Sequence, residues 1–200
     1  MAQENEGIPG VGRIEAFSDG VIAIIITIMV LELKAPEAAG LRQLWQLWPV
    51  FLAYVLSFVY VGLYWANHHR LLSHARRVSN GLVWLNMGLL FTLSLIPFST
   101  AYLGGQHFNR DGTLVYLVSM VLPTFFYVPL QSVIRREGVQ GAAATAYHRQ
   151  TTRKGVAAML IYLTGFALTF VSPWLGIAAA VIVGVLWFLP DSPFDRLFGR

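Results

Sequence analysis

The chain has 200 residues, of which 56% are apolar, 14% are aromatic and 12% are charged. Soluble domains carry about 25% charged residues, so this composition indicates a membrane protein. The sequence contains no cysteine, which excludes thiol catalysis, cysteine-based zinc sites and iron–sulfur clusters. The net charge of +4 does not indicate a nucleic-acid partner, because the basic residues are spread through short loops.

A helix needs about 20 mostly apolar residues to cross a bilayer core of roughly 30 Å. The chain contains five long apolar stretches, and the last of them, 155–190, is too long for one crossing. Pro173 divides this stretch into two, because proline favours the start of a helix over its interior. The sequence therefore predicts an all-α membrane protein, a single domain over 1–200 with six transmembrane helices. Their approximate ranges are 13–33, 43–69, 80–104, 112–134, 154–171 and 174–190.

Lysine and arginine predict the orientation, because they accumulate in cytoplasmic loops. An even number of crossings puts both ends of the chain on one side. Of the 14 basic residues, only Lys34, Arg42 and Arg110 fall on the other side. We therefore expect a multi-pass protein of the cell membrane, with both termini and a polar linker over 135–154 in the cytoplasm. The acidic N-terminal segment does not fit a cleavable signal peptide.

The first helix has one unusual face. Thr27 is the only polar side chain in its apolar part. It belongs to a stripe with i, i+3, i+4, i+7 spacing, made of Ile24, Thr27, Ile28 and Leu31. On periodicity alone, the simpler interpretation is that Thr27 bonds to the backbone of its own helix and the stripe is ordinary packing.

Asp19 lies at membrane depth, where an ionisable side chain is costly and usually has a partner. Ser18 and Asp19 would cap a helix that begins at Gly20, but about 12 residues span only roughly 18 Å, too little to cross. The helix must therefore begin near Ile14. We expect a structural network that joins the first three helices rather than a catalytic site. Its expected members are Arg13, Phe17, Ser18, Asp19, Trp65, His68, His69, Trp84 and Asn86, with Arg70 as a further candidate.

Three short patterns carry a family resemblance. The first helix contains Arg13-x-x-x-Phe17-Ser18-Asp19, then Ala23-Ile24 and Thr27, and it closes with Leu31-Glu32. The next two helices contain Tyr64-Trp65-x-x-His68-His69-Arg70 and Trp84-Leu85-Asn86 with Pro97-Phe98. These patterns resemble the signature of the transmembrane protein 175 family of potassium channels, and in the last two cases its bacterial members. The likeness covers the first three helices and the six-helix count.

The resemblance implies a potassium-selective cation channel in which the first helices of the assembled subunits line a central pore. Bacterial members have six helices and form tetramers, so one Phe17-Ser18-Asp19 element per chain implies a homotetramer. The positions that match the family's pore constriction are Ile24, Ile28 and Leu31, with Thr27 at its hydroxyl layer. The expected partners are further copies of the chain, membrane lipid and permeant K⁺, with no cofactor and no resident metal.

The sequence contains nothing that resembles the carbonyl-lined loop of familiar potassium channels. We expect instead that rings of branched apolar side chains narrow the pore and force ions to shed water. Because Na⁺ holds its water more tightly than K⁺, such a constriction favours K⁺ modestly. The ring at Ile24 is also a candidate gate, since an apolar constriction closes by dewetting.

A secondary transporter is the main alternative, and it predicts internal repeats and a helix broken at the midplane. We find no repeat, and Pro123 and Pro129 are more simply kinks. An enzyme is not expected, because no Gly-x-Ser-x-Gly motif occurs. Adjacent histidines point to different faces of a helix and no fourth ligand is evident, so hydrogen bonding is favoured over metal binding at His68, His69 and His74.

Overall fold

The structure is a computed structural model that describes residues 10–36, 40–138 and 141–189. All regular structure in these residues is helical, as the sequence predicts. In chain order the helices are α1 (Val11–Ile28), the short 3-10 helix η1 (Met29–Glu32), α2 (Leu41–Gln46), α3 (Trp48–Leu72), α4 (Asn80–Leu93), α5 (Ile96–Gly105), α6 (Arg110–Val121), α7 (Thr124–Glu137), α8 (Ala142–Leu168) and α9 (Pro173–Phe188).

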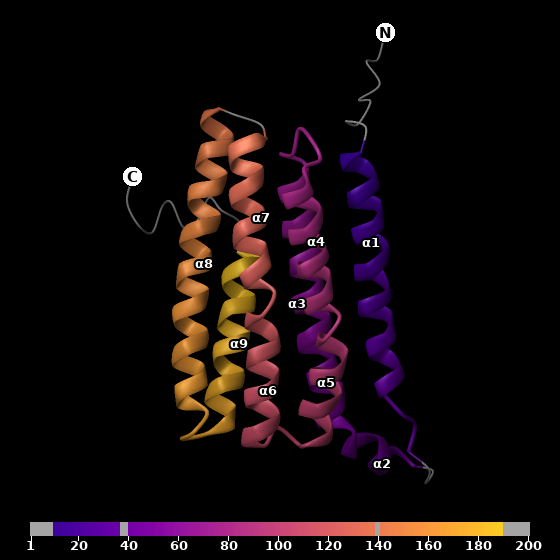
Figure 1. Ribbon diagram of the computed structural model, residues 1–200. Coiled ribbons are helices and arrows are strands. Elements are labelled where there is room, and N and C mark those ends of the chain that lie inside the picture. The colour runs from indigo at the N-terminus through magenta and orange to yellow at the C-terminus, as the bar shows by residue number, and fades with distance from the viewer. Residues whose placement is uncertain (1–9, 37–39, 139–140, 190–200) are drawn as a thin grey trace.

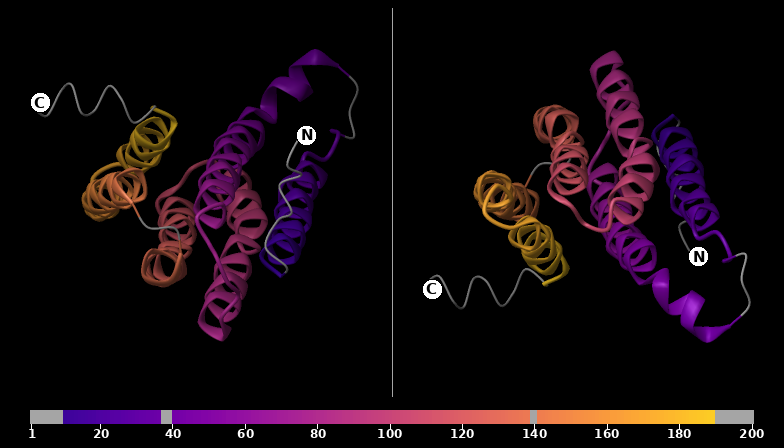
Figure 2. Two further views of the ribbon diagram at one scale, coloured as in Figure 1. Left: turned by 90° about the horizontal axis from the view of Figure 1, so that it is seen from above. Right: turned by 90° about the horizontal axis from the view of Figure 1, so that it is seen from below.

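The long helices run along one common axis (Figure 1). The short helix α2 lies across one end of this bundle. The start of α1, the end of α3, the end of α7 and the start of α8 lie together at the opposite end. Seen along the axis, α1 occupies one outer edge of the subunit, and α8 and α9 occupy the other (Figure 2). The first helix is therefore peripheral within a single subunit.

Four helical segments in the described residues are long and apolar enough to cross a membrane: Val11–Glu32, Trp48–Leu72, Asn80–Gly105 and Arg110–Glu137. Pro173–Phe188 is apolar but shorter. Helix α8 is long, but its first half carries Arg149, Arg153 and Lys154. The chain thus has the several apolar helices of a membrane protein, and four of the six expected ranges meet the criteria for a span by length and composition alone.

Two of the expected helices are interrupted near their middle. The range 80–104 divides into α4 and α5 just before a proline, and the range 112–134 divides into α6 and α7 at Pro123. Hydrogen bonding continues through both interruptions, because Leu95 N donates to Thr92 O at 3.3 Å and Phe125 N donates to Leu122 O at 3.1 Å. Both are therefore tightened turns between coaxial segments, the usual effect of a proline that lacks an N–H.

Two other ranges differ from those expected. The range 43–69 splits at Leu47 into α2 and α3, and α3 continues to Leu72. The stretch 135–154, expected as a polar linker, is mostly helical, because α7 extends to Glu137 and α8 begins at Ala142. A search for charge-free stretches misses this helix, since alanine and arginine favour helix whatever the surrounding polarity.

Small residues allow the helices to approach closely, as in other membrane bundles. At Gly104 in α5, an added Cβ would lie 2.7 Å from Cα of Val50 in α3. An added Cβ at the neighbouring Gly105 would meet no atom within 4 Å. Alanine substitutions at these two adjacent glycines therefore separate the effect of the contact between α3 and α5 from the effect of helix propensity.

Replacing Gly104 with alanine is expected to destabilise the subunit by about 1–3 kcal/mol, because the new methyl group forces the backbone of α3 to move. The measurement is thermal unfolding of the full chain in detergent. Gly105→Ala makes the same chemical change in open space and is expected to stay within about 0.5 kcal/mol of the parent. Equal melting temperatures for the two variants would show that α3 and α5 are not in close contact.

Candidate functional site

Helix α1 and the short helix η1 that continues it have two contrasting faces. One packs against the rest of the subunit and includes Ile22, which is 1% exposed, together with the buried Ile25 and Met29. The other carries the stripe noted in the sequence, where Ile24 is 60% and Leu31 is 71% exposed. The stripe is therefore on the outside of the single subunit and is not core packing within it.

Thr27 in the stripe bonds to its own helix. Its Oγ1 donates to Ala23 O and Ile24 O, at 2.9 and 3.0 Å. The simpler interpretation of the sequence predicts this bond to the helix backbone. It also predicts that the stripe packs against the rest of the protein, and within the subunit Thr27 does not do so, because it is exposed. The hydroxyl proton is used within the helix. The oxygen of Thr27 can therefore only accept a hydrogen bond from, or coordinate, a group outside the subunit.

A buried chain of hydrogen bonds joins α1 to α4 and α3. Ser18 Oγ donates to the carbonyl of Ile14 at 2.7 Å and accepts from Asn86 Nδ2 at 2.9 Å. Asn86 Oδ1 lies 2.7 Å from His68 Nε2, which must carry the proton because the amide oxygen only accepts. Ser18, Asn86 and His68 are all buried. Three helices thus meet at one asparagine.

Two further contacts join α1 to α3 nearer the surface. Trp65 Nε1 donates to Asp19 Oδ1 at 2.9 Å, and His69 Nδ1 lies 2.7 Å from Glu15 Oε1. The rings of Trp65 and His69 stack, with centroids 6.0 Å apart. Glu15 was not among the expected members of the network. Its signal was present in the sequence, because Glu15 and Asp19 are four residues apart on α1, as Trp65 and His69 are on α3.

The structure does not bring all the expected residues together. Arg13, Phe17 and Trp84 are exposed, Trp84 by 74%, and within residues 10–36, 40–138 and 141–189 they make no hydrogen bond or ion pair. Arg70 lines a cavity with Lys154.

The histidines do not form a metal site in the part of the chain that the structure describes. No group of three or more His, Asp or Glu side chains there is placed to hold an ion. His68 bonds to Asn86 and His69 pairs with Glu15. His74 stacks on Tyr147 of α8, with ring centroids 4.8 Å apart. The site is therefore an exposed apolar stripe with one hydroxyl, held in place by polar contacts on the opposite side of α1.

Known proteins are similar in sequence to this chain. Residues 13–97 match a sequence model of the family described as "Endosomal/lysosomal potassium channel TMEM175". A potassium channel of Chryseobacterium sp. (strain P1-3) is 40% identical over 186 residues, which cover 92% of this chain and 96% of that one. A potassium channel of Streptomyces collinus is 36% identical over 196 residues, which cover 91% and 93%.

A solved structure is also similar. It is described as the crystal structure of a lysosomal potassium-selective channel TMEM175 homolog from Chamaesiphon minutus, and it superposes with a TM-score of 0.77 at 30% identity. The alignment covers 90% of this chain and 97% of that chain. The residues matched by the family model include both the exposed stripe of α1 and the network behind it.

Proposed function

The chain belongs to the TMEM175 family, and from that membership we propose that it is a potassium channel, which passes K⁺ passively down its gradient. The support is that relatives named potassium channels match it over more than nine-tenths of both chains. The family and these relatives are ion channels and not enzymes, which agrees with the expectation from the sequence.

The exposed stripe of α1 is the observation that supports a pore lined by the first helices. The apolar side chains of Ile24, Ile28 and Leu31 face away from the core of the subunit. This face lies at an outer edge of the bundle, where a single subunit cannot enclose an aqueous path with it (Figure 2). In the proposed homotetramer, four copies of α1 surround one axis, because closed rotational symmetry brings the same face of every copy to the centre.

In this arrangement the stripe gives two kinds of ring. Ile24, Ile28 and Leu31 form apolar rings at which an ion loses part of its hydration shell. The ring of Thr27 lies between them and offers oxygen lone pairs that offset part of this cost. Discrimination of K⁺ from Na⁺ then follows from the smaller dehydration cost of K⁺. The apolar ring at Ile24 also serves as the gate, because such a constriction closes by dewetting.

The proposed subunit crosses the cell membrane six times as one channel domain, with α8 and α9 as the last two crossings. Helix α9 has 16 residues and is about 24 Å long, somewhat less than a typical bilayer core, a difference that local thinning accommodates. Both termini are proposed to be cytoplasmic. Two of the basic residues that favour this orientation, Arg196 and Arg200, lie outside the described residues.

The interrupted helices are the observation that favours a transporter as the second candidate. Transporters bind their ions at unwound segments near the midplane, where freed backbone carbonyls coordinate the cargo. Here the backbone hydrogen bonds continue across both interruptions, so few carbonyls are freed for an ion. The channel therefore remains the better-supported function.

Recordings from the reconstituted full chain test the proposal. With K⁺ on one side of a bilayer and Na⁺ on the other, the reversal potential is expected to move toward the K⁺ equilibrium potential without any coupling ion. Protein-free bilayers are the control. Transport that strictly requires a proton or Na⁺ gradient would favour the transporter instead.

A further inference from the structure

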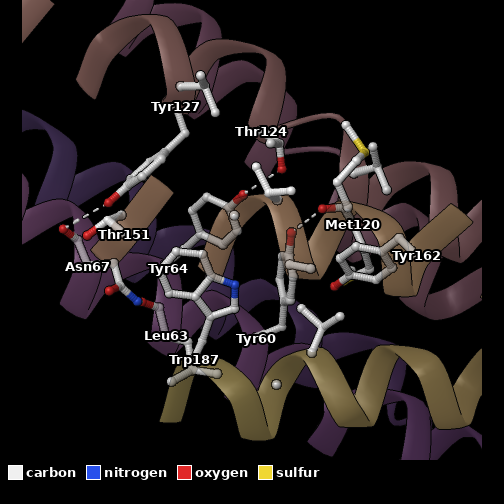
Figure 3. Close-up of a pocket in the computed structure, with 18 of the residues that line it drawn as sticks. Tyr60, Leu63, Tyr64, Asn67, Met120, Thr124, Tyr127, Thr151, Tyr162 and Trp187 are labelled. Carbon is white, nitrogen blue, oxygen red and sulfur yellow. Dashed lines mark hydrogen bonds between the residues drawn. The ribbon is translucent and has the colours of Figure 1, made fainter. Parts of the chain in front are cut away.

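A cavity of about 260 Å³ lies inside the subunit, on the far side of α3 from the pore-lining helix (Figure 3). Side chains from α3, α6, α7, α8 and α9 line it. Most of them are apolar or aromatic, and Figure 3 shows four tyrosine rings and one indole around the space: Tyr60, Tyr64, Tyr127, Tyr162 and Trp187. Its volume is near the lower end of the range for small-molecule sites, about 300–1,000 Å³.

Three of the four tyrosine hydroxyls are used by the protein. Tyr60 donates to the carbonyl of Met120, Tyr127 donates to the carbonyl of Asn67 at 3.4 Å, and Tyr64 lies 3.5 Å from Thr124 Oγ1. The hydroxyl of Tyr162 is buried and has no partner among the described residues. A buried polar group without a partner is costly, so the cavity offers one unused hydrogen bond to an occupant.

A second cavity of about 300 Å³ adjoins the first and shares Leu63, Asn67, Thr151 and Trp187 with it. It adds two cationic side chains, Arg70 and Lys154. Lys154 is only 6% exposed, and its Nζ donates to the carbonyl of Leu189 at 2.9 Å. The two cavities together run from an apolar interior to a basic end.

The apolar cavity also reaches the outside of the subunit. Val128 of α7 and Val156 of α8 both line it, and they are 48% and 57% exposed. An opening between two membrane-spanning helices admits a lipid sideways from the bilayer. The volume suits part of one hydrocarbon chain, so the rest of that chain and the second chain of a phospholipid would stay outside in the bilayer.

We propose that the two adjoining cavities bind an anionic phospholipid of the surrounding leaflet, with one acyl chain among the tyrosines and the headgroup phosphate at Arg70 and Lys154. Basic pockets between transmembrane helices attract anionic headgroups, and an apolar interior attracts the chain. A free phosphate lacks the chain, and a neutral lipid lacks the charge.

The site is one helix away from the pore-lining face. Tyr60, Leu63 and Asn67 of α3 line the first cavity, whereas Trp65, His68 and His69 of the same helix contact α1 and α4. A bound chain therefore packs behind the helix that holds α1.

Native mass spectrometry of the full chain tests the site with matched-chain phosphatidylglycerol and phosphatidylcholine. The parent is expected to retain phosphatidylglycerol and to bind phosphatidylcholine more weakly. Gly184 lines the first cavity, and an added Cβ there meets no atom within 4 Å, so Gly184→Leu starts a side chain in open space beside the cavity and reduces the room for a lipid chain. This variant is expected to lose most bound phosphatidylglycerol. The neighbouring Val185 is exposed and does not line the cavity, so Val185→Leu should bind as the parent does.

The charged end is tested by Arg70→Gln and Lys154→Gln. Each is expected to weaken phosphatidylglycerol binding about fivefold, the usual contribution of one basic residue beside an anionic lipid, and to leave phosphatidylcholine unchanged. Brominated phosphatidylglycerol quenches tryptophan fluorescence, and the part of this quenching that disappears in Trp187→Phe, while that of the other five tryptophans remains, gives a second measurement if a charge variant does not fold. Equal binding of both lipids, equal binding by Gly184→Leu and the parent, or preferential binding of oleate would each overturn the proposal.

Discussion

Replacing Ile24 with asparagine is expected to move the reversal potential in a K⁺/Na⁺ gradient toward zero and to increase the current. Ile24 is exposed within the subunit, so the substitution leaves the core unchanged. In the proposed pore, an amide ring holds water that the isoleucine ring excludes, and Na⁺ then passes with more of its hydration shell. A loss of about 1 kcal/mol of discrimination corresponds to roughly a fivefold fall in the permeability ratio.

The matched control is Ile182→Asn. Ile182 is also exposed, by 55%, but it belongs to α9, at the opposite edge of the subunit from α1 (Figure 2), so the same chemical change should leave the reversal potential unaltered. Bilayer recordings under mixed K⁺ and Na⁺ measure both variants. If Ile24→Asn and Ile182→Asn behave alike, the stripe does not face the permeation path and α1 has some other role.

The approximate positions of the four long apolar spans could be predicted from the sequence, because apolar length is a direct consequence of the bilayer. The polar first half of α8 could not be predicted in this way. The interruptions could not, since a proline in an apolar run is compatible with a kink, a break or a new helix start. The sequence also does not predict the separate helix α2. Leu44 and Trp45 are apolar and continue the expected range 43–69, although they lie in α2 and outside the span formed by α3. Composition alone does not distinguish a span from an apolar helix across its end.

Periodicity identified the stripe of α1, but not which way it faces. An apolar stripe in a membrane helix has the same pattern whether it meets lipid, a neighbouring helix or another subunit, so exposure had to come from the fold. For the network, reasoning from charge emphasised Asp19, whose acceptor bond to Trp65 lies near the surface. The buried centre is Asn86, which is neutral and lies on another helix. Burial of a neutral amide depends on helix packing, and no local pattern reports it.

Asn86→Ala is therefore expected to be more damaging than any change at Asp19. Removing the amide leaves Ser18 Oγ without its donor and His68 Nε2 without its acceptor, both buried. With about 1–3 kcal/mol for each buried group left unsatisfied, we expect a loss of about 2–4 kcal/mol, because Ser18 Oγ keeps its bond to the carbonyl of Ile14. Thermal unfolding of the full chain in detergent measures this, and cross-linking measures the share of oligomer.

Trp65→Phe is a milder change at the contact between α1 and α3, for comparison with Asn86→Ala. It removes one hydrogen bond to Asp19 but keeps an aromatic ring, and because the pair lies near the surface we expect a loss below about 1 kcal/mol. The double variant Ser18→Ala with Asn86→Ala should lose less than the two single changes added together, since the serine no longer has an unmet bond. Additive losses, or an Asn86→Ala variant as stable as the parent, would show that the buried network does not hold α1 to α3 and α4. The alignment of the proposed pore-lining stripe would then not depend on this asparagine.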